Sequence, residues 1–136
     1  MYDINRFIEA QERDYELALS EIKSGYKVSH WMWYIFPQLK GLGESYTSEY
    51  YGINGIEEAK VYINNDYLRN NLLEISHAVL VLDDDIANIF GYPDCLKLKS
   101  CMTLFNEVLD DPVFIDILNK FYNGEKDNAT LQKIKR

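Results

Sequence analysis

The segment HWMWYIFPQLKGLG, residues 30–43, decides the expected fold. Residues 31–36 are apolar without a break and include two tryptophans, a tyrosine and a phenylalanine. A segment that is apolar on every side is buried whichever backbone conformation it adopts. We expect a short buried helix that ends at Pro37, because the residue before a proline is pushed out of the helical region. A strand stays open as the rival, since alternate residues of the segment are equally apolar.

Both sides of this segment carry helical patterns. Residues 3–24 place apolar side chains at helical spacing, and Gly25 is the expected stop. Downstream, short polar residues repeatedly precede apolar runs, which is typical of helix starts. The expected caps are Asp3, Asn54, Asp66, Asp94, Asp111 and Asp127. With about six to eight helices and no hairpin signal, the chain is predicted to be all-α: a compact multihelical single domain over residues 1–136, with a short buried central aromatic helix.

The composition limits the partners. Of 136 residues, 14 are basic and 22 are acidic, so the net charge is −8. This charge repels phosphate backbones, and the basic residues form only short clusters, so we expect no binding to nucleic acid. One or two buried cations would still suffice for a small anionic ligand. The sequence shows neither a secretion leader nor an apolar run of about 18 residues, which predicts a cytoplasmic protein that does not enter membranes.

Metals and cofactors are not expected. Cys95 and Cys101 lie on one predicted helix, where their spacing turns the side chains about 240° apart, so we expect two reduced thiols. Two histidines and two dispersed cysteines give no zinc spacing. The aspartates at residues 83–85 precede a short helix, where carboxylates suit the helix dipole better than they suit Mg²⁺. No phosphate-binding loop or hydrolase motif is present.

The aromatic segment and its flanks carry the first candidate site residues. His30 is the candidate catalytic base, since chemistry near neutral pH commonly uses histidine, although a lone histidine is more often structural. Lys27 is the candidate cation for an anionic group, and Gln38 carries an amide that needs hydrogen-bond partners once it is buried. Trp31 and Trp33 are candidates to stack on a ligand or wall it, with core packing as the alternative.

The second group of candidates lies in FGYPDCLKLKSCMTLF, residues 90–105. Asp94 is expected to cap a helix, and it is also a ligand-binding candidate because the free N–H groups of a helix start attract anions. Lys97 and Ser100 follow on the same helix at a spacing that brings their side chains close together. We expect Lys97 to supply a second cation and Ser100 to orient the ligand. A Ser–Lys nucleophile pair at this spacing is the less favoured interpretation.

These two blocks, with RFIEAQERDYELAL near the start and a closing D-N-A-T-L, resemble a bacterial family of unknown function, the domain numbered 1810, whose members are sometimes labelled calpastatin. The resemblance covers nearly the whole chain. It implies a compact multihelical fold with a short buried central helix, and it implies no reaction, because the family has no established activity. The calpastatin label does not carry over, since that inhibitor is disordered and repetitive and this chain is neither.

Polar residues in both blocks need partners, since a buried unpaired polar group costs about 1–3 kcal/mol. Our leading hypothesis is a ring-lined pocket between residues 30–45 and the helix from Asp94 that binds a small anionic or nucleotide-like molecule. An enzyme acting on nucleotide or ADP-ribose derivatives is one version, in which His30 transfers a proton. The alternative is a non-catalytic helical scaffold or protein-interaction module. The chain is expected to be a monomer or a homodimer.

Overall fold

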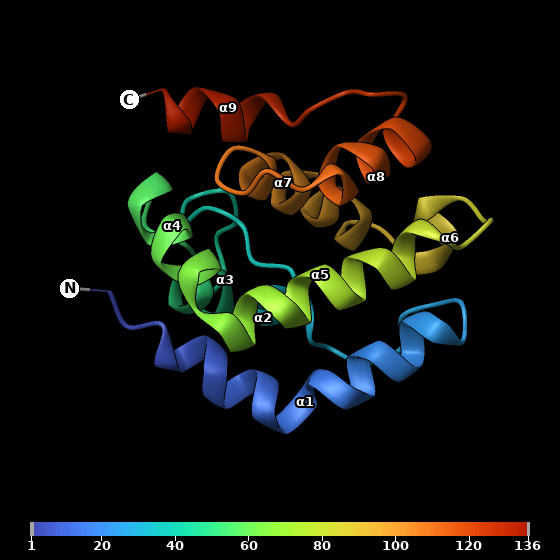
Figure 1. Ribbon diagram of the computed structural model, residues 1–136, viewed down its shortest axis with the longest axis horizontal. Coiled ribbons are helices and arrows are strands. Elements are labelled where there is room, and N and C mark those ends of the chain that lie inside the picture. The colour runs from blue at the N-terminus through green and yellow to red at the C-terminus, as the bar shows by residue number, and fades with distance from the viewer. Residues whose placement is uncertain (1, 136) are drawn as a thin grey trace.

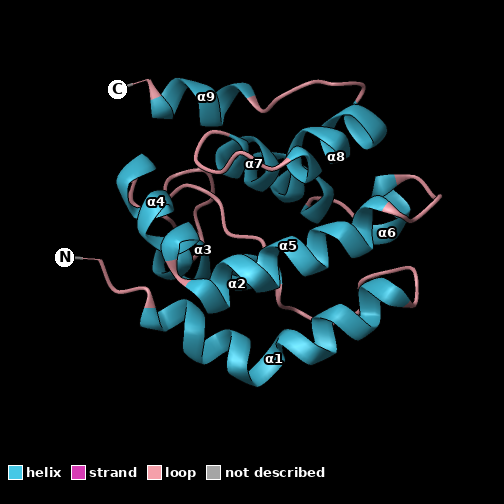
Figure 2. Cartoon of the chain, viewed as in Figure 1, coloured by secondary structure: helices cyan, strands magenta, loops and turns pink. Residues whose placement is uncertain are grey.

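The computed structural model describes residues 2–135, and every regular element among them is a helix (Figure 1, Figure 2). The all-α prediction is therefore confirmed. The helices of this part are α1 (Asn5–Lys23), α2 (Met32–Ile35), α3 (Tyr46–Tyr51), α4 (Ile56–Asn64), α5 (Asp66–Leu80), α6 (Ile86–Phe90), α7 (Asp94–Asn106), α8 (Pro112–Tyr122) and α9 (Asn128–Ile134). The sequence patterns did not indicate α3. None of these helices combines the length and hydrophobicity that a bilayer span requires.

The longer helices stack in layers (Figure 1). α1 packs against α5, α5 against α8, and α8 against α7, while α9 lies against α7 at the outer edge. The buried apolar side chains between these layers form one core cluster that extends from Phe7 to Leu118. α2 contacts both α1 and α3, so the loop that follows α2 is fixed at both ends.

The aromatic segment folds as the expected short buried helix. α2 spans Met32–Ile35, and three of its four residues are buried. Trp31 precedes it and is buried as well, with its ring centroid 6.3 Å from that of Phe90. Pro37 follows closely and ends the helix. Within residues 31–36, Trp33 alone is partly exposed, so its indole faces outward.

Gln11 joins four helices from inside the core. Its side-chain N–H groups donate to the Tyr34 carbonyl at 2.8 Å and to the Tyr62 hydroxyl at 2.9 Å, and its oxygen accepts from the Asn71 amide at 3.0 Å. These partners belong to α2, α4 and α5. A buried amide that finds partners for its donors and its acceptor adds specificity without the cost of an unpaired group. Gln11 therefore has a structural role.

Glu21 holds the segment after α1 in place. Its carboxylate accepts hydrogen bonds from the Val28 N–H (2.7 Å), the Ser29 N–H (2.9 Å), the Ser29 hydroxyl (2.6 Å) and the Trp31 indole N–H (2.9 Å). Burial alone would raise the pKa of Glu21, but these hydrogen bonds favour the charged form more strongly and lower the pKa to about 2. The charged carboxylate thus fixes the approach to α2.

Acid is expected to destabilise the protein through Glu21. A carboxyl group whose pKa is lowered from 4.5 to about 2 stabilises the folded state fully above pH 4.5, and this contribution disappears as the pH falls toward 2. We expect the loss to be on the order of 2 kcal/mol after solvent screening. Urea unfolding at pH 7 and pH 3 measures it. The free energy of unfolding of Glu21→Gln should fall less between these pH values than that of the parent. The exposed control Glu12→Gln should show the same fall as the parent. A fall in E21Q as large as in the parent would contradict this role.

Two of the expected caps are confirmed. Asp111 accepts a hydrogen bond from the Val113 N–H at 2.9 Å, and Asp127 accepts one from the Thr130 N–H at 3.0 Å. The helices expected to have their caps at Asp3, Asn54, Asp66 and Asp94 instead have Ile4, Gly55, Asn65 and Pro93 at the cap position. A cap is chosen by local geometry as well as by residue type, and other groups can capture a short polar side chain. Asp94 is such a case, because it binds two lysines.

Candidate functional site

Three charged side chains meet at the start of α7. Asp94 Oδ1 accepts a hydrogen bond from Lys97 Nζ at 2.8 Å, and Asp94 Oδ2 lies 2.9 Å from Lys27 Nζ. The Lys27 side chain is 7% exposed and the Lys97 side chain 19% exposed. Burial raises the pKa of Asp94, but hydrogen bonds from the two lysines lower it by more, so the carboxyl group is charged. Among the described residues, this Lys27–Asp94–Lys97 cluster has two cations and one anion and keeps a net positive charge.

Each lysine of the cluster also lies against an indole. Lys27 Nζ is 5.1 Å from the centroid of the Trp31 ring, and Lys97 Nζ is 3.8 Å from that of Trp33. An ammonium group is attracted to the negatively polarised face of an indole at such distances. Lys27 and Trp31 form the inner half of this arrangement, and Lys97 and Trp33 form the partly exposed outer half.

The outer half borders a cavity of about 480 Å³, which we call the α7 pocket. Its walls come from residues 33–45, from α7 with the proline before it, and from the segment at the start of α9. The lining residues are Trp33, Gln38, Leu42, Gly43, Glu44, Ser45, Pro93, Leu96, Lys97, Lys99, Ser100, Asp127 and Ala129. The structure thus brings four sequence-predicted residues together: Trp33, Gln38, Lys97 and Ser100.

Gln38 is a largely buried residue whose side-chain amide has no protein partner among the described residues. The residue is only 8% exposed, and its backbone carbonyl accepts a hydrogen bond from the Ile53 N–H at 2.9 Å. Within residues 2–135, no group is placed to hydrogen-bond its side-chain amide, which faces the pocket. An amide has two donors and one acceptor oxygen, and here these groups remain accessible at the pocket. The fold therefore holds an amide where a bound molecule can pair with it.

Ser100 and Lys99 add further polar groups on α7. The Ser100 hydroxyl donates to the Leu96 carbonyl over a long 3.3 Å, which leaves its oxygen free to accept. Lys99 Nζ lies 2.5 Å from Glu125 Oε1. The Glu125 side chain is 72% exposed, so this ion pair is weak and its lysine can take another anionic partner.

Gly43 lets the loop wall of the pocket lie close to α3. A Cβ atom at this position would come within 2.9 Å of Ser48 Cβ and 3.6 Å of the outer edge of the Trp33 indole. Ser45 caps α3, and its hydroxyl accepts a hydrogen bond from the Ser48 N–H at 3.1 Å. A larger residue at 43 would push the loop away from α3 and distort this wall.

The other four sequence-predicted residues do not line the pocket. Lys27 and Asp94 lie behind it, where they neutralise part of each other's charge and orient Lys97. Trp31 is in the core with its indole N–H on Glu21. His30 is exposed and lies outside the lining, so its position gives no support for proton transfer in this pocket.

Sequence reasoning did not place the C-terminal residues at the site. Asp127 and Ala129 line the pocket, and both belong to the motif D-N-A-T-L, for which the family resemblance gives no role. That motif is the signal from which they can be found. The contribution of Lys99 has no comparable signal, because a lysine on a helix is usually solvated.

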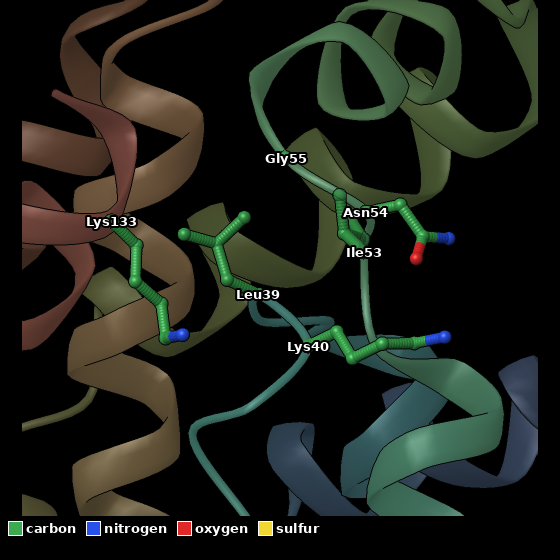
Figure 3. A pocket seen from close by; sticks show the side chains of 6 residues that line it. All are labelled: Leu39, Lys40, Ile53, Asn54, Gly55 and Lys133. Atoms are coloured by element: carbon green, nitrogen blue, oxygen red, sulfur yellow. The ribbon is translucent and has the colours of Figure 1, made fainter. Parts of the chain in front are cut away.

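A second hollow, of about 380 Å³, lies beside the segment that follows α2 (Figure 3). It is lined by Leu39, Lys40, Ile53, Asn54, Gly55 and Lys133. Leu39 and Ile53 pair here through the single parallel bridge found among residues 2–135. Figure 3 shows the ammonium groups of Lys40 and Lys133 pointing to different sides of the loop, so they do not form a shared anion site.

Comparison with known proteins supports the fold and gives no activity. The model of a family described as protein of unknown function (DUF1810) matches residues 1–134. The crystal structure of the conserved hypothetical protein Rv1873 from Mycobacterium tuberculosis is similar, with 40% sequence identity and a TM-score of 0.97 over 99% of this chain and 98% of that chain. No curated protein matches the sequence. The chain belongs to the DUF1810 family of proteins of unknown function.

Proposed function

We propose that this protein binds a small anionic, nucleotide-like molecule in the α7 pocket. Gln38 is the main support, because the residue is only 8% exposed, lines the pocket, and makes no side-chain hydrogen bond among the described residues. Binding sites commonly combine an apolar wall with a few fixed polar groups that orient the ligand. The Ser100 hydroxyl, with its weak 3.3 Å contact to the Leu96 carbonyl, provides a second such group.

The preference for an anion comes from the Lys27–Asp94–Lys97 cluster. Its two ammonium groups share one carboxylate, and Lys97 is the member that reaches the pocket. Because Lys27 and Asp94 are largely desolvated, their charges fix the position of the Lys97 ammonium. A phosphate or carboxylate next to Lys97 would neutralise the remaining positive charge. Lys99 provides a second cation on the same wall.

The preference for a nucleotide comes from the shape and polarity of the walls. Leu42, Pro93 and Leu96 form an apolar surface beside the partly exposed Trp33. A glutamine amide presents a donor next to an acceptor, which matches the edge of a nucleobase. The pocket volume of about 480 Å³ lies within the range of small-molecule sites. His30 is outside the pocket, so we propose binding and assign no reaction.

Nucleoside monophosphates and diphosphates are expected to raise the melting temperature more than sugar phosphates do. A ligand present at one hundred times its dissociation constant adds about 2.7 kcal/mol to the free energy of unfolding. A thermal-shift titration across these compounds measures the effect. If none of them changes the melting temperature at millimolar concentration, the proposal is wrong and the helical scaffold or interaction module becomes the better description.

Two variants locate the binding to the pocket. Gln38→Leu removes the amide, and Lys97→Met removes the charge but keeps the side-chain stem; each is expected to weaken nucleotide binding about tenfold or more. Lys60→Met is the matched control, because Lys60 also pairs with a carboxylate three residues earlier, Glu57 at 3.5 Å, but on α4 outside the pocket. Equal weakening by K60M would show that only general charge matters.

The setting proposed for this activity is the cytoplasm. Cys95 and Cys101 are both unpaired and buried, and burial raises the pKa of each thiol. Free thiols of this kind suit a reducing compartment. They lie outside the lining of the pocket and have no part in the proposed binding.

A further inference from the structure

The segment that closes one side of the α7 pocket is thinly attached to the rest of the protein. We call residues 125–134, which include α9, the C-terminal strap. Within α9, Thr130 is the single buried residue. The preceding helix, α8, buries four apolar residues: Val113, Phe114, Ile117 and Leu118. Elements with little buried apolar surface open locally at low cost, so the strap belongs to the least stable part of the described chain.

Besides Ile134, which packs against the core cluster, three further contacts hold the described part of the strap. The Asp127 N–H donates to the buried Thr103 hydroxyl at 2.9 Å, and Lys99 pairs with the exposed Glu125. At the far end of α9, the Lys133 side chain passes close to Gly41. A Cβ atom on residue 41 would lie 2.8 Å from Lys133 Nζ. The first contact is shielded from water, whereas the other two are at the surface and contribute little. Among its polar contacts, the strap is therefore anchored mainly by Thr103, in addition to the apolar contact of Ile134.

The strap crosses both hollows of the site. Asp127 and Ala129 line the α7 pocket, and Lys133 lines the second hollow beside the segment that follows α2. In Figure 1, α9 runs along the outer edge of α7 and has no other helix outside it. Movement of the strap away from α7 would remove one wall of the pocket and the contact of Ile134 with the core, and it would leave the packing of α1, α5, α8 and α7 on one another in place.

We propose that the C-terminal strap is a gate that moves off α7 to admit a ligand and closes over it, and that Thr103 is the latch. The proposal rests on the function proposed above. In the closed state the strap places Asp127 and Ala129 in the lining, so closure completes this wall of the pocket, while the Asp127 carboxylate is held by Thr130. Bound ligand favours the closed strap because the strap contributes contacts only in that state.

Amide hydrogen exchange of the full chain tests the gate without a ligand. In the parent protein, amides of α9 are expected to exchange at least about tenfold faster than those of α8. Thr103→Val, which removes the acceptor of the Asp127 N–H, should speed exchange in α9 by about a further tenfold and leave α8 unchanged. Ser76→Ala is the control, because it removes a buried hydroxyl on α5 that has no partner. Equal protection of α9 and α8, or no effect of T103V, would overturn the gate.

Amide hydrogen exchange measured in the presence of saturating AMP separates this inference from the proposed function. AMP is expected to slow exchange in α9 about tenfold and to bind T103V more weakly than the parent. If AMP raises the melting temperature but leaves α9 exchange unchanged, the pocket binds nucleotides and the gate is wrong. If AMP changes neither quantity, the proposed function fails, and the gate fails with it.

Discussion

Arg6→Met is expected to lower the free energy of unfolding by about 3–5 kcal/mol. The guanidinium of Arg6 contacts Glu58 through both oxygens, at 2.8 and 3.2 Å, and it donates to the carbonyls of Tyr50 (2.8 Å) and Gly52 (2.9 Å). The side chains of Arg6 and Glu58 are 7% and 0% exposed. Loss of the arginine would leave the Glu58 charge buried without a cation, and it would also free three carbonyls, those of Asp3, Tyr50 and Gly52.

Urea unfolding of three proteins checks this expectation. Arg13→Met is the matched control, because Arg13 is exposed and its carboxylate partner among the described residues is the neighbouring Asp14, so the change should cost less than about 1 kcal/mol. The double variant Arg6→Met/Glu58→Met removes both buried charges and should be more stable than Arg6→Met alone. If Arg6→Met lowers the free energy of unfolding no more than Arg13→Met does, the importance of the Arg6–Glu58 pair is contradicted.

Asp94→Asn is expected to cost about 2–3 kcal/mol, although Asp94 is a surface-proximal residue at a helix start. The reason is Lys27, whose side chain is 7% exposed and whose carboxylate partner among the described residues is Asp94. Asparagine keeps the shape of the side chain but cannot neutralise that ammonium group. Lys97→Met should cost much less, since Lys97 is more exposed and its loss leaves the Lys27–Asp94 pair intact.

The double variant Lys27→Met/Asp94→Asn separates charge from packing. If the unpaired ammonium of Lys27 causes the loss, removal of that ammonium should restore part of the stability of Asp94→Asn in urea unfolding. Additive losses in the double variant would instead show that Asp94 and Lys27 act independently. In that event the Lys27–Asp94–Lys97 cluster would not be the unit described above.

The sequence predicts the helical class and the buried aromatic helix well, because both follow from local rules. The 3.6-residue spacing in residues 3–24 and the break at Pro37 depend only on neighbours in the chain. α3 escapes the same reasoning because its sequence YTSEYY has no apolar stripe and its residues favour helix weakly. Its helical form depends on the Ser45 cap and on packing against α2, which is a tertiary contact.

The candidate site is predictable only in part. Trp33, Gln38, Lys97 and Ser100 meet at one pocket as the two sequence blocks suggest. The pattern cannot tell which of Trp31 and Trp33 lines the pocket and which lies in the core, because a segment that is apolar all round gives no signal for its outer face. The pairing of Lys27 with Asp94 joins residues far apart in the chain and follows from the packing of α7 beside α6 and the loop after α1.

The unlike surroundings of the two tryptophans give the protein a spectroscopic reporter of its own. Trp31 is enclosed in the core with its N–H on a carboxylate, whereas Trp33 has an ammonium group 3.8 Å from its ring and borders a cavity. A charge that close to an indole alters the energy of its excited state. Intrinsic emission from Trp33 therefore responds to displacement of Lys97, while Trp31 reports on the buried Lys27 5.1 Å from its ring.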